Sequence, residues 1–430
     1  MPGYRLFHVC LSIAVFATLS PLAAHAQNGK DVSQTAGSAA RGVVIDAATR
    51  KPLPGVTVYV YTARPRTGTS AFCPSCYPDC GKTARTDAVG SFLVPSLSQN
   101  LFFRFLAVRP GYEPAFVEEA DPTRSTSLQF ALKARPQNAA NARRTVRATL
   151  RDPLGQPAVG ATVEFVGYRG ADGRGGFGAF SGYDEIAIAD EAGQFALRAA
   201  DENVSLYTLV KARGLAPRIL SGLRTGATAQ TVTLGYGASV LGTVRTAAGK
   251  PVPNAVVEFV PTNRNVESFT GWQEIATHAD GTFGLVNVPP DTDGYLCVLM
   301  ESLHDGQAVV RQRVHTATEK GTVEGVVLTT TPGATLRGQI VLPNQAPVPP
   351  GTRVMLGRAE TWDAQSAVAD KEGRFAFAGV PPTDAAEISL RIQGYRYAKT
   401  TAGLSPGGYS VDVKEPGKQK TPIVITMIKE

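Results

Sequence analysis

The sequence predicts an all-β protein built as a tandem array of four β-sandwiches behind an export signal. Two observations predict the array: one order of sequence features recurs four times, and the chain reads as short alternating strands separated by Gly- and Pro-containing turns. A third observation excludes helical bundles, since no long stretch of the mature chain has apolar residues at a 3.6-residue period. At 430 residues the chain is long enough for several domains of ordinary size.

Each copy of the repeat opens with an alternating run, passes through a Pro-containing turn, and resumes with a second alternating run. The strict period of two places every other side chain on one face of a sheet. The paired runs are 42–46 with 52–58, 146–150 with 157–163, 242–245 with 251–257, and 338–341 with 349–354.

A second turn follows in every copy, in which a glycine precedes a phenylalanine by two residues. The pairs are Gly90/Phe92, Gly193/Phe195, Gly281/Phe283 and Gly373/Phe375. The turns begin with Asp87, Asp190, His278 and Asp370. An Asp at the first position bonds the backbone of the turn, Gly accepts positive φ, and the Phe then starts the return strand facing the core. The pattern predicts a β-hairpin in each copy.

These segments resemble the carboxypeptidase regulatory-like domain, above all in the Pro52-Leu53-Pro54-Gly55-Val56-Thr57-Val58 and Asp87-to-Phe92 stretches of the first copy. The resemblance implies an Ig-like, transthyretin-like sandwich with an accessory role. Copy three departs from it with His278 in place of Asp, and copy four has a displaced Pro turn. We expect sandwiches over residues 41–134, 145–235, 238–331 and 334–430, with a polar linker over 134–144.

The first 26 residues have the three parts of a cleaved secretory signal. Arg5 lies in a short basic region, an apolar stretch runs from Val9 to Leu22, and Ala24-His25-Ala26 precedes Gln27. We therefore expect export to the periplasm or the outside of the cell, a mature chain that starts at Gln27, and a flexible leader over residues 27–40. No later run approaches the roughly 18 apolar residues that predict a membrane-spanning helix.

Charge gives little reason to expect a nucleic-acid partner. The chain has 43 Lys and Arg against 36 Asp and Glu, a formal net charge of +7, and only 18% of its residues are charged. Such a small surplus, spread over four domains, is typical of an ordinary solvated surface.

Three cysteines lie within eight residues of the first copy, at Cys73, Cys76 and Cys80. In an exported protein we expect a disulfide that closes this loop, and the same three thiols are alternative ligands for a metal ion. A redox-active dithiol is a third alternative, although no helix start follows that would lower the thiol pKa. Cys297, in an apolar strand of copy three, is predicted to be a buried free thiol.

A large aromatic residue precedes the turn glycine in copies two to four: Tyr183, Trp272 and Trp362. Flat rings beside acids and amides are the usual components of a sugar-binding surface, so these residues are candidate ligand-binding residues. The alternative is that each ring covers the open end of its own sandwich.

No catalytic constellation is present in the sequence. It has no His-Glu-x-x-His zinc motif and no Gly-x-Ser-x-Gly nucleophile elbow, and no helix pattern accompanies its Gly-x-Gly-x-x-Gly stretch at residues 173–178. We expect a non-enzymatic spacer and binding protein without a cofactor, directed toward glycan or an envelope or outer-membrane protein. The alternatives are a purely structural or protein-interaction scaffold and metal binding by the loop from Cys73 to Cys80.

Overall fold

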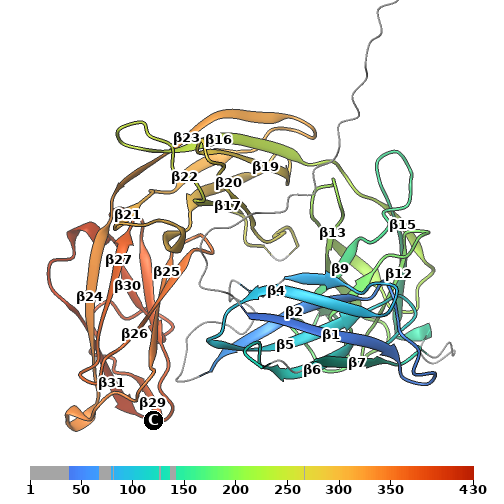
Figure 1. Ribbon diagram of the computed structural model, residues 1–430, viewed down its shortest axis with the longest axis horizontal. Helices are drawn as coiled ribbons and strands as arrows, with labels where there is room; N and C mark the ends of the chain where they lie inside the picture. The colour runs from blue at the N-terminus through green and yellow to red at the C-terminus, as the bar shows by residue number, and fades with distance from the viewer. Residues whose placement is uncertain (1–37, 67–78, 81, 125–126, 136–141, 266) are drawn as a thin grey trace, which may run out of the picture. The chain divides into compact units, whose positions relative to one another are not determined.

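The computed structural model describes residues 38–66, 79–80, 82–124, 127–135, 142–265 and 267–430 (Figure 1). The named elements in these ranges are 31 strands and three 3-10 helices, η1 (Met300–Ser302), η2 (Pro343–Gln345) and η3 (Pro416–Lys418). Residues 142 and 143 are also helical. The prediction of an all-β fold is confirmed. Over the same ranges no helix is long and apolar enough to cross a membrane.

The first sandwich packs a three-stranded sheet, in the order β4-β1-β7, on a four-stranded sheet in the order β3-β2-β5-β6. Its strands are β1 (Ser38–Asp46), β2 (Thr57–Pro65), β3 (Thr83–Arg85), β4 (Ser91–Leu97), β5 (Leu101–Val108), β6 (Ala115–Ala120) and β7 (Leu128–Leu132). One apolar core draws on both sheets, with Phe92 and Phe130 from one layer and Phe103 and Phe105 from the other.

The second sandwich combines the sheet β12-β8-β15 with the sheet β10-β9-β13-β14, to which β11 adds by pairing with β9. The strands are β8 (Thr145–Arg151), β9 (Thr162–Arg169), β10 (Gly175–Phe177), β11 (Ile186–Ile188), β12 (Gln194–Arg198), β13 (Ser205–Lys211), β14 (Arg218–Arg224) and β15 (Gln230–Thr233). The Gly-rich stretch at residues 173–178 thus contributes a short strand paired to β9.

The third sandwich has the sheets β19-β16-β23-β21 and β18-β17-β20-β22. Its strands are β16 (Ala238–Thr246), β17 (Val256–Pro261), β18 (Gln273–Ala276), β19 (Thr282–Val288), β20 (Asp293–Val298), β21 (Gln307–Ala308), β22 (Gln312–His315) and β23 (Thr322–Pro332). Only Gly333 separates β23 from the first strand of the next sandwich.

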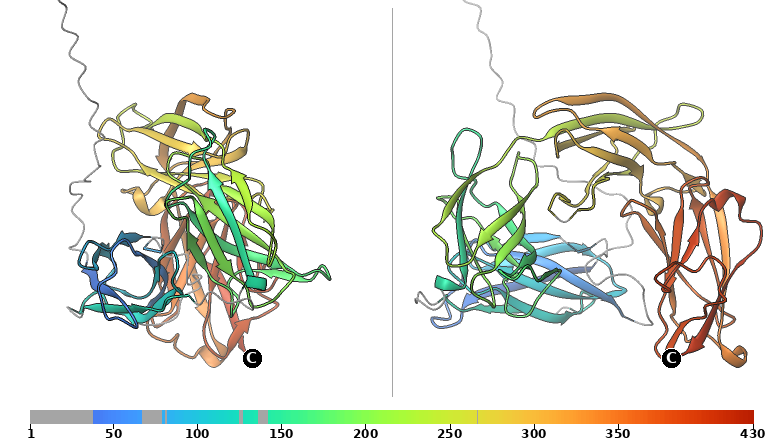
Figure 2. Two further views of the ribbon diagram at one scale, coloured as in Figure 1. Left: turned by 90° about the vertical axis from the view of Figure 1, so that its right-hand side faces the viewer. Right: turned by 180° about the vertical axis from the view of Figure 1, so that it is seen from behind.

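The fourth sandwich repeats this arrangement with the sheets β27-β24-β31-β29 and β26-β25-β28-β30, which Figure 2 shows in orange and red from two further directions. Its strands are β24 (Ala334–Val341), β25 (Arg353–Arg358), β26 (Ala364–Val368), β27 (Arg374–Val380), β28 (Ala386–Leu390), β29 (Tyr395–Tyr397), β30 (Val411–Val413) and β31 (Ile423–Lys429).

In all four sandwiches the opening strand pairs in the same way with two partners. It runs antiparallel to the strand that follows the glycine turn, and parallel to a strand near the end of the copy. Since the parallel partner closes each copy, every sandwich is completed only when its last strand is in place.

The predicted hairpin turns are present in every copy. Gly90, Gly193, Gly281 and Gly373 have φ between 74° and 78°, and the four phenylalanines that follow are buried. In copies one, two and four the Asp side chain accepts backbone amides, as with Ser91 N to Asp87 Oδ1 at 2.8 Å. In copy three Asp280 takes over this role, and Thr282 N donates to its Oδ1 at 3.0 Å.

Each turn glycine also contacts the opening strand. Its carbonyl accepts a backbone hydrogen bond of 2.8 Å from Val44, Leu150, Val244 or Ile340 in the four copies. The buried phenylalanine lies across from a small residue of the same strand: Gly42, Ala148, Gly242 and Gly338 in turn. An aromatic ring covering a cross-strand glycine stabilises a position that has no side chain of its own.

Replacing Gly373 by alanine tests this turn. An added Cβ would overlap the carbonyl oxygen of Ile340, whereas at Gly394, with nearly the same φ, it would meet nothing within 4 Å. We expect Gly394→Ala to cost about 1 kcal/mol from backbone strain alone, and Gly373→Ala to cost about 2–4 kcal/mol. Urea unfolding of the full chain measures the difference, and equal losses would contradict the packing argument.

Candidate functional site

Tyr183 lies inside the second sandwich rather than on its surface. The residue is 7% exposed, and its ring stacks on Phe165 and Tyr168 with ring centroids 5.0 Å apart in both pairs. Its hydroxyl donates to Asp201 Oδ2 at 2.9 Å, and burial together with this carboxylate raises the pKa of the tyrosine. The burial favours the alternative we gave for Tyr183, a structural role in its own sandwich, over ligand binding.

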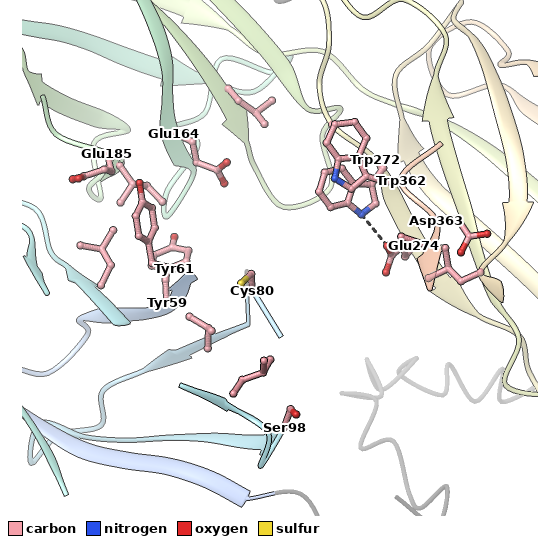
Figure 3. A pocket seen from close by; sticks show the side chains of 18 of the residues that line it. Tyr59, Tyr61, Cys80, Ser98, Glu164, Glu185, Trp272, Glu274, Trp362 and Asp363 are labelled. Atoms are coloured by element: carbon pink, nitrogen blue, oxygen red, sulfur yellow. Dashed lines mark hydrogen bonds between the residues drawn. The ribbon is translucent and has the colours of Figure 1, made fainter. Parts of the chain in front are cut away.

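Trp272 and Trp362 meet each other, although they come from different sandwiches (Figure 3). Trp272 directly precedes β18, and Trp362 lies between β25 and β26. Their rings stack with centroids 4.8 Å apart and an interplanar angle of 19°, while 37% and 41% of the two residues stay exposed. The rings therefore pack between the third and fourth sandwiches, an arrangement that neither sequence alternative contained.

The stacked pair is held in place from two sides. Trp272 Nε1 donates to Glu274 Oε1 at 2.8 Å. On the other side the ring centroid of Phe269 lies 5.7 Å from that of Trp362. The Arg264 guanidinium lies over the Phe269 and Trp362 rings, 4.7 Å and 5.2 Å from their centroids. Such cation–π contacts fix ring orientation and add modest stability.

The backbone of Trp362 contacts a buried pair, Glu258 on β17 and Cys297 on β20, of which the sequence analysis identified only Cys297. Both residues are fully buried. The Cys297 thiol donates to Glu258 Oε2 at 3.1 Å, and the Trp362 amide of the fourth sandwich donates to the same oxygen at 3.3 Å. Cys297 is a buried free thiol as predicted, but it also hydrogen-bonds a carboxylate. Burial beside Glu258 raises the pKa of this thiol well above its ordinary value.

A second buried polar group, centred on Arg358, crosses the same junction. Its Nη2 donates to Val309 O at 3.2 Å, a carbonyl of the third sandwich. Its Nη2 lies 3.2 Å from Asp363 Oδ2 and its Nε lies 3.6 Å from Asp384 Oδ2, both within ion-pair distance. Asp363 Oδ2 makes no hydrogen bond to any described residue. Burial raises the pKa of Asp363, and the Arg358 charge opposes that rise.

Both aspartates also bind backbone amides of the third sandwich. Met300 N donates to Asp363 Oδ1 at 3.0 Å, and Arg311 N donates to Asp384 Oδ2 at 2.9 Å. The Met300 side chain packs in the apolar core of the fourth sandwich. We call this set of contacts, together with the stacked tryptophans, the 3–4 junction.

The structure describes one of the three cysteines predicted to form a disulfide or to bind a metal ion. Cys73 and Cys76 lie outside the described residues, and Cys80 is half-buried beside the first apolar core. Among the described residues no three His, Cys, Asp or Glu side chains are grouped so that they could hold a metal ion. The disulfide and the metal alternative for Cys73, Cys76 and Cys80 therefore stay predictions.

Comparison with known proteins does not assign the chain to a family. No family model and no curated protein matches it. Similar solved structures include a streptococcal ancillary pilin (12% identity, TM-score 0.24, covering 66% of this chain and 99% of that one). The minor pilin of Streptococcus agalactiae (11%, 0.24, 45% and 97%) and the Bacillus anthracis TIE protein (9%, 0.19, 94% and 76%) also match. Scores this low carry no information about function.

Removing the Arg358 charge should strongly weaken the 3–4 junction, because Asp363 and Asp384 would stay buried without their partner. We expect Arg358→Leu to lower the free energy of unfolding by about 3–5 kcal/mol. Arg337→Leu, at an exposed position of β24, is the matched control and should change it by no more than about 0.5 kcal/mol. Chemical denaturation checks both. Similar small losses in the two variants would show that Asp363 and Asp384 do not depend on Arg358 as their buried partner.

Proposed function

We propose that this chain is an exported, non-enzymatic scaffold of four β-sandwiches, in which the 3–4 junction sets the geometry between successive domains. The observation that carries the proposal is Met300: its side chain belongs to the core of the fourth sandwich while its amide binds Asp363. A flexible tether between independent domains needs no such shared core, whereas a spacer that holds two ligands or partners at a set separation does.

The other successive pairs of sandwiches also have specific contacts. Leu106 and Val108 of the first sandwich form a small apolar cluster with Ile186 of the second, and Arg135 pairs with Asp184 at 2.8 Å. Between the second and third sandwiches, the Tyr207 hydroxyl donates to Glu267 at 3.0 Å. These contacts support a scaffold with ordered domains, and the proposed domain limits of 41–134, 145–235, 238–331 and 334–430 are part of the proposal.

The partner that suits such a scaffold is another protein of the cell envelope, periplasmic or outer-membrane. The exposed edge strand of a β-sandwich can pair with an extended segment of another protein, which then becomes an additional strand of the sheet. This mode of binding favours a protein partner for this architecture. The carboxypeptidase regulatory-like identity remains part of this proposal, and it concerns an accessory module rather than a peptidase.

Export is tested by the mass of the protein recovered from cells that express the full gene. We expect the chain in the envelope or medium fraction with Gln27 at its N-terminus, because a signal peptidase cleaves after small residues such as Ala26. A variant with Ala24→Arg and Ala26→Arg should keep its first 26 residues. Recovery of the wild-type chain in the cytosol with an intact N-terminus would overturn the export part of the proposal.

A glycan-binding role is the second candidate, and the exposed tryptophan stack beside Glu274 is the observation that favours it. The scaffold proposal predicts that Trp362→Ala lowers the free energy of unfolding by about 1–3 kcal/mol, since its ring fills the junction, and leaves retention on a glycan array unchanged. Trp362→Phe is the control that keeps an aromatic ring. Lost retention with an unchanged melting temperature would favour glycan binding instead.

A further inference from the structure

The Glu258 carboxyl group is buried at the 3–4 junction with incomplete hydrogen bonding. Its Oε2 accepts from the Cys297 thiol and from the Trp362 amide, while its Oε1 has no hydrogen-bond partner among the described residues. Because one of its donors belongs to the fourth sandwich, the environment of this group depends on the docking of that sandwich. An ionised carboxylate in such a place is costly unless a cation is paired with it.

None of the charged groups around Glu258 forms an ion pair with it in the described part of the chain. On the third sandwich Cys297 and Glu274 face it, and on the fourth sandwich Asp363 does. Arg358 lies within ion-pair distance of Asp363 and Asp384. The opposite charges of Arg264 and Glu258 attract each other, but Arg264 Nη2 donates to the Glu360 carbonyl at 2.7 Å rather than to Glu258. Among the described residues, no ion pair includes Glu258.

The proton on Glu258 is consequently held more tightly in the docked structure than in water. Desolvation, reinforced by the charges of Asp363 and Glu274, raises the pKa of Glu258 from 4.5 to about 7, against the opposing hydrogen bonds from Cys297 and Trp362. A carboxyl group whose pKa is raised by docking stabilises the docked state most below its undocked pKa. That contribution falls as pH rises from about 4.5 and is gone once pH passes about 7. The raised pKa of Asp363 acts in the same direction.

We propose that the 3–4 junction is a proton-sensitive latch, closed when the buried Glu258 carries its proton and loosened when Glu258 ionises. Loosening exposes Cys297 and separates Trp272 from Trp362. The latch rests on the scaffold proposal, because only an exported chain meets the pH outside the cytoplasm. It deepens that proposal by making the spacing of the last two sandwiches depend on this pH.

The chain carries its own reporter for this latch, since Trp272 and Trp362 are its only tryptophans. For the purified full chain we expect tryptophan emission to shift reversibly to longer wavelength between pH 5 and pH 8, while far-UV circular dichroism stays constant. Glu258→Gln keeps the shape of the side chain without its charge and should remove most of the shift, leaving the smaller part that Asp363 contributes. Glu324→Gln, at an exposed position of β23, should leave it as in the wild type.

Alkylation of Cys297, followed by peptide mass mapping, is the second measurement. At each pH the rate for wild type is divided by the rate for Glu258→Gln, which cancels the intrinsic pH dependence of thiol chemistry. The ratio should rise by up to about tenfold per pH unit between pH 5 and pH 7 and then level off.

A constant ratio, or a wild-type emission spectrum that does not change over this range, would overturn the latch. The spectrum of the wild type decides the question even if Glu258→Gln fails to fold. Because both measurements use purified protein, the latch can fail while the scaffold proposal stands, and cytosolic retention of the chain would overturn the scaffold without affecting the latch.

Discussion

The backbone hydrogen bond from the opening strand to the turn-glycine carbonyl is the contact on which every sandwich depends. It forms at 2.8 Å in all four copies, from Val44, Leu150, Val244 and Ile340. It fixes the hairpin against the strand that also pairs with the closing strand, so one local turn sets the register of a whole sheet. The phenylalanine two residues later then points inward, because side chains alternate faces along a strand.

The 3–4 junction uses a different kind of interaction, buried charge. Replacing a buried ion pair with apolar residues often costs nothing, so Arg358, Asp363 and Asp384 are better understood as setting a single docking geometry than as adding stability. Each of these charges reaches a particular backbone group or partner across the junction. Apolar contacts such as those of Met300 stabilise the junction but do not depend on orientation, whereas the hydrogen bonds form only at one relative orientation of the two sandwiches.

Much of the fold was predictable because its signals are local. The turn glycines, the buried phenylalanines and the alternating strands all depend on residues a few positions apart, and all were found where the repeats placed them. The aromatic candidates fared differently. The spacing identified Trp272 and Trp362 as unusual, but the stacking of one on the other joins residues 90 positions apart in two sandwiches, which no periodicity records. Tyr183 shares their position in the repeat and yet is buried in its own core.

Arg358 and Glu258 show what the amino-acid order settles and what it leaves to the folded chain. Along β25, Val354, Leu356 and Arg358 share one buried face, so the period of two already placed this arginine inward. On β17, Glu258 alternates with the core residues Val257 and Phe259, and the same rule points it outward to solvent. It is nevertheless fully buried, since the loop that carries Trp362 covers the outer face of its sheet. Alternation decides which face of a strand a residue occupies, but only the packing of one sandwich on the next decides whether that face meets water.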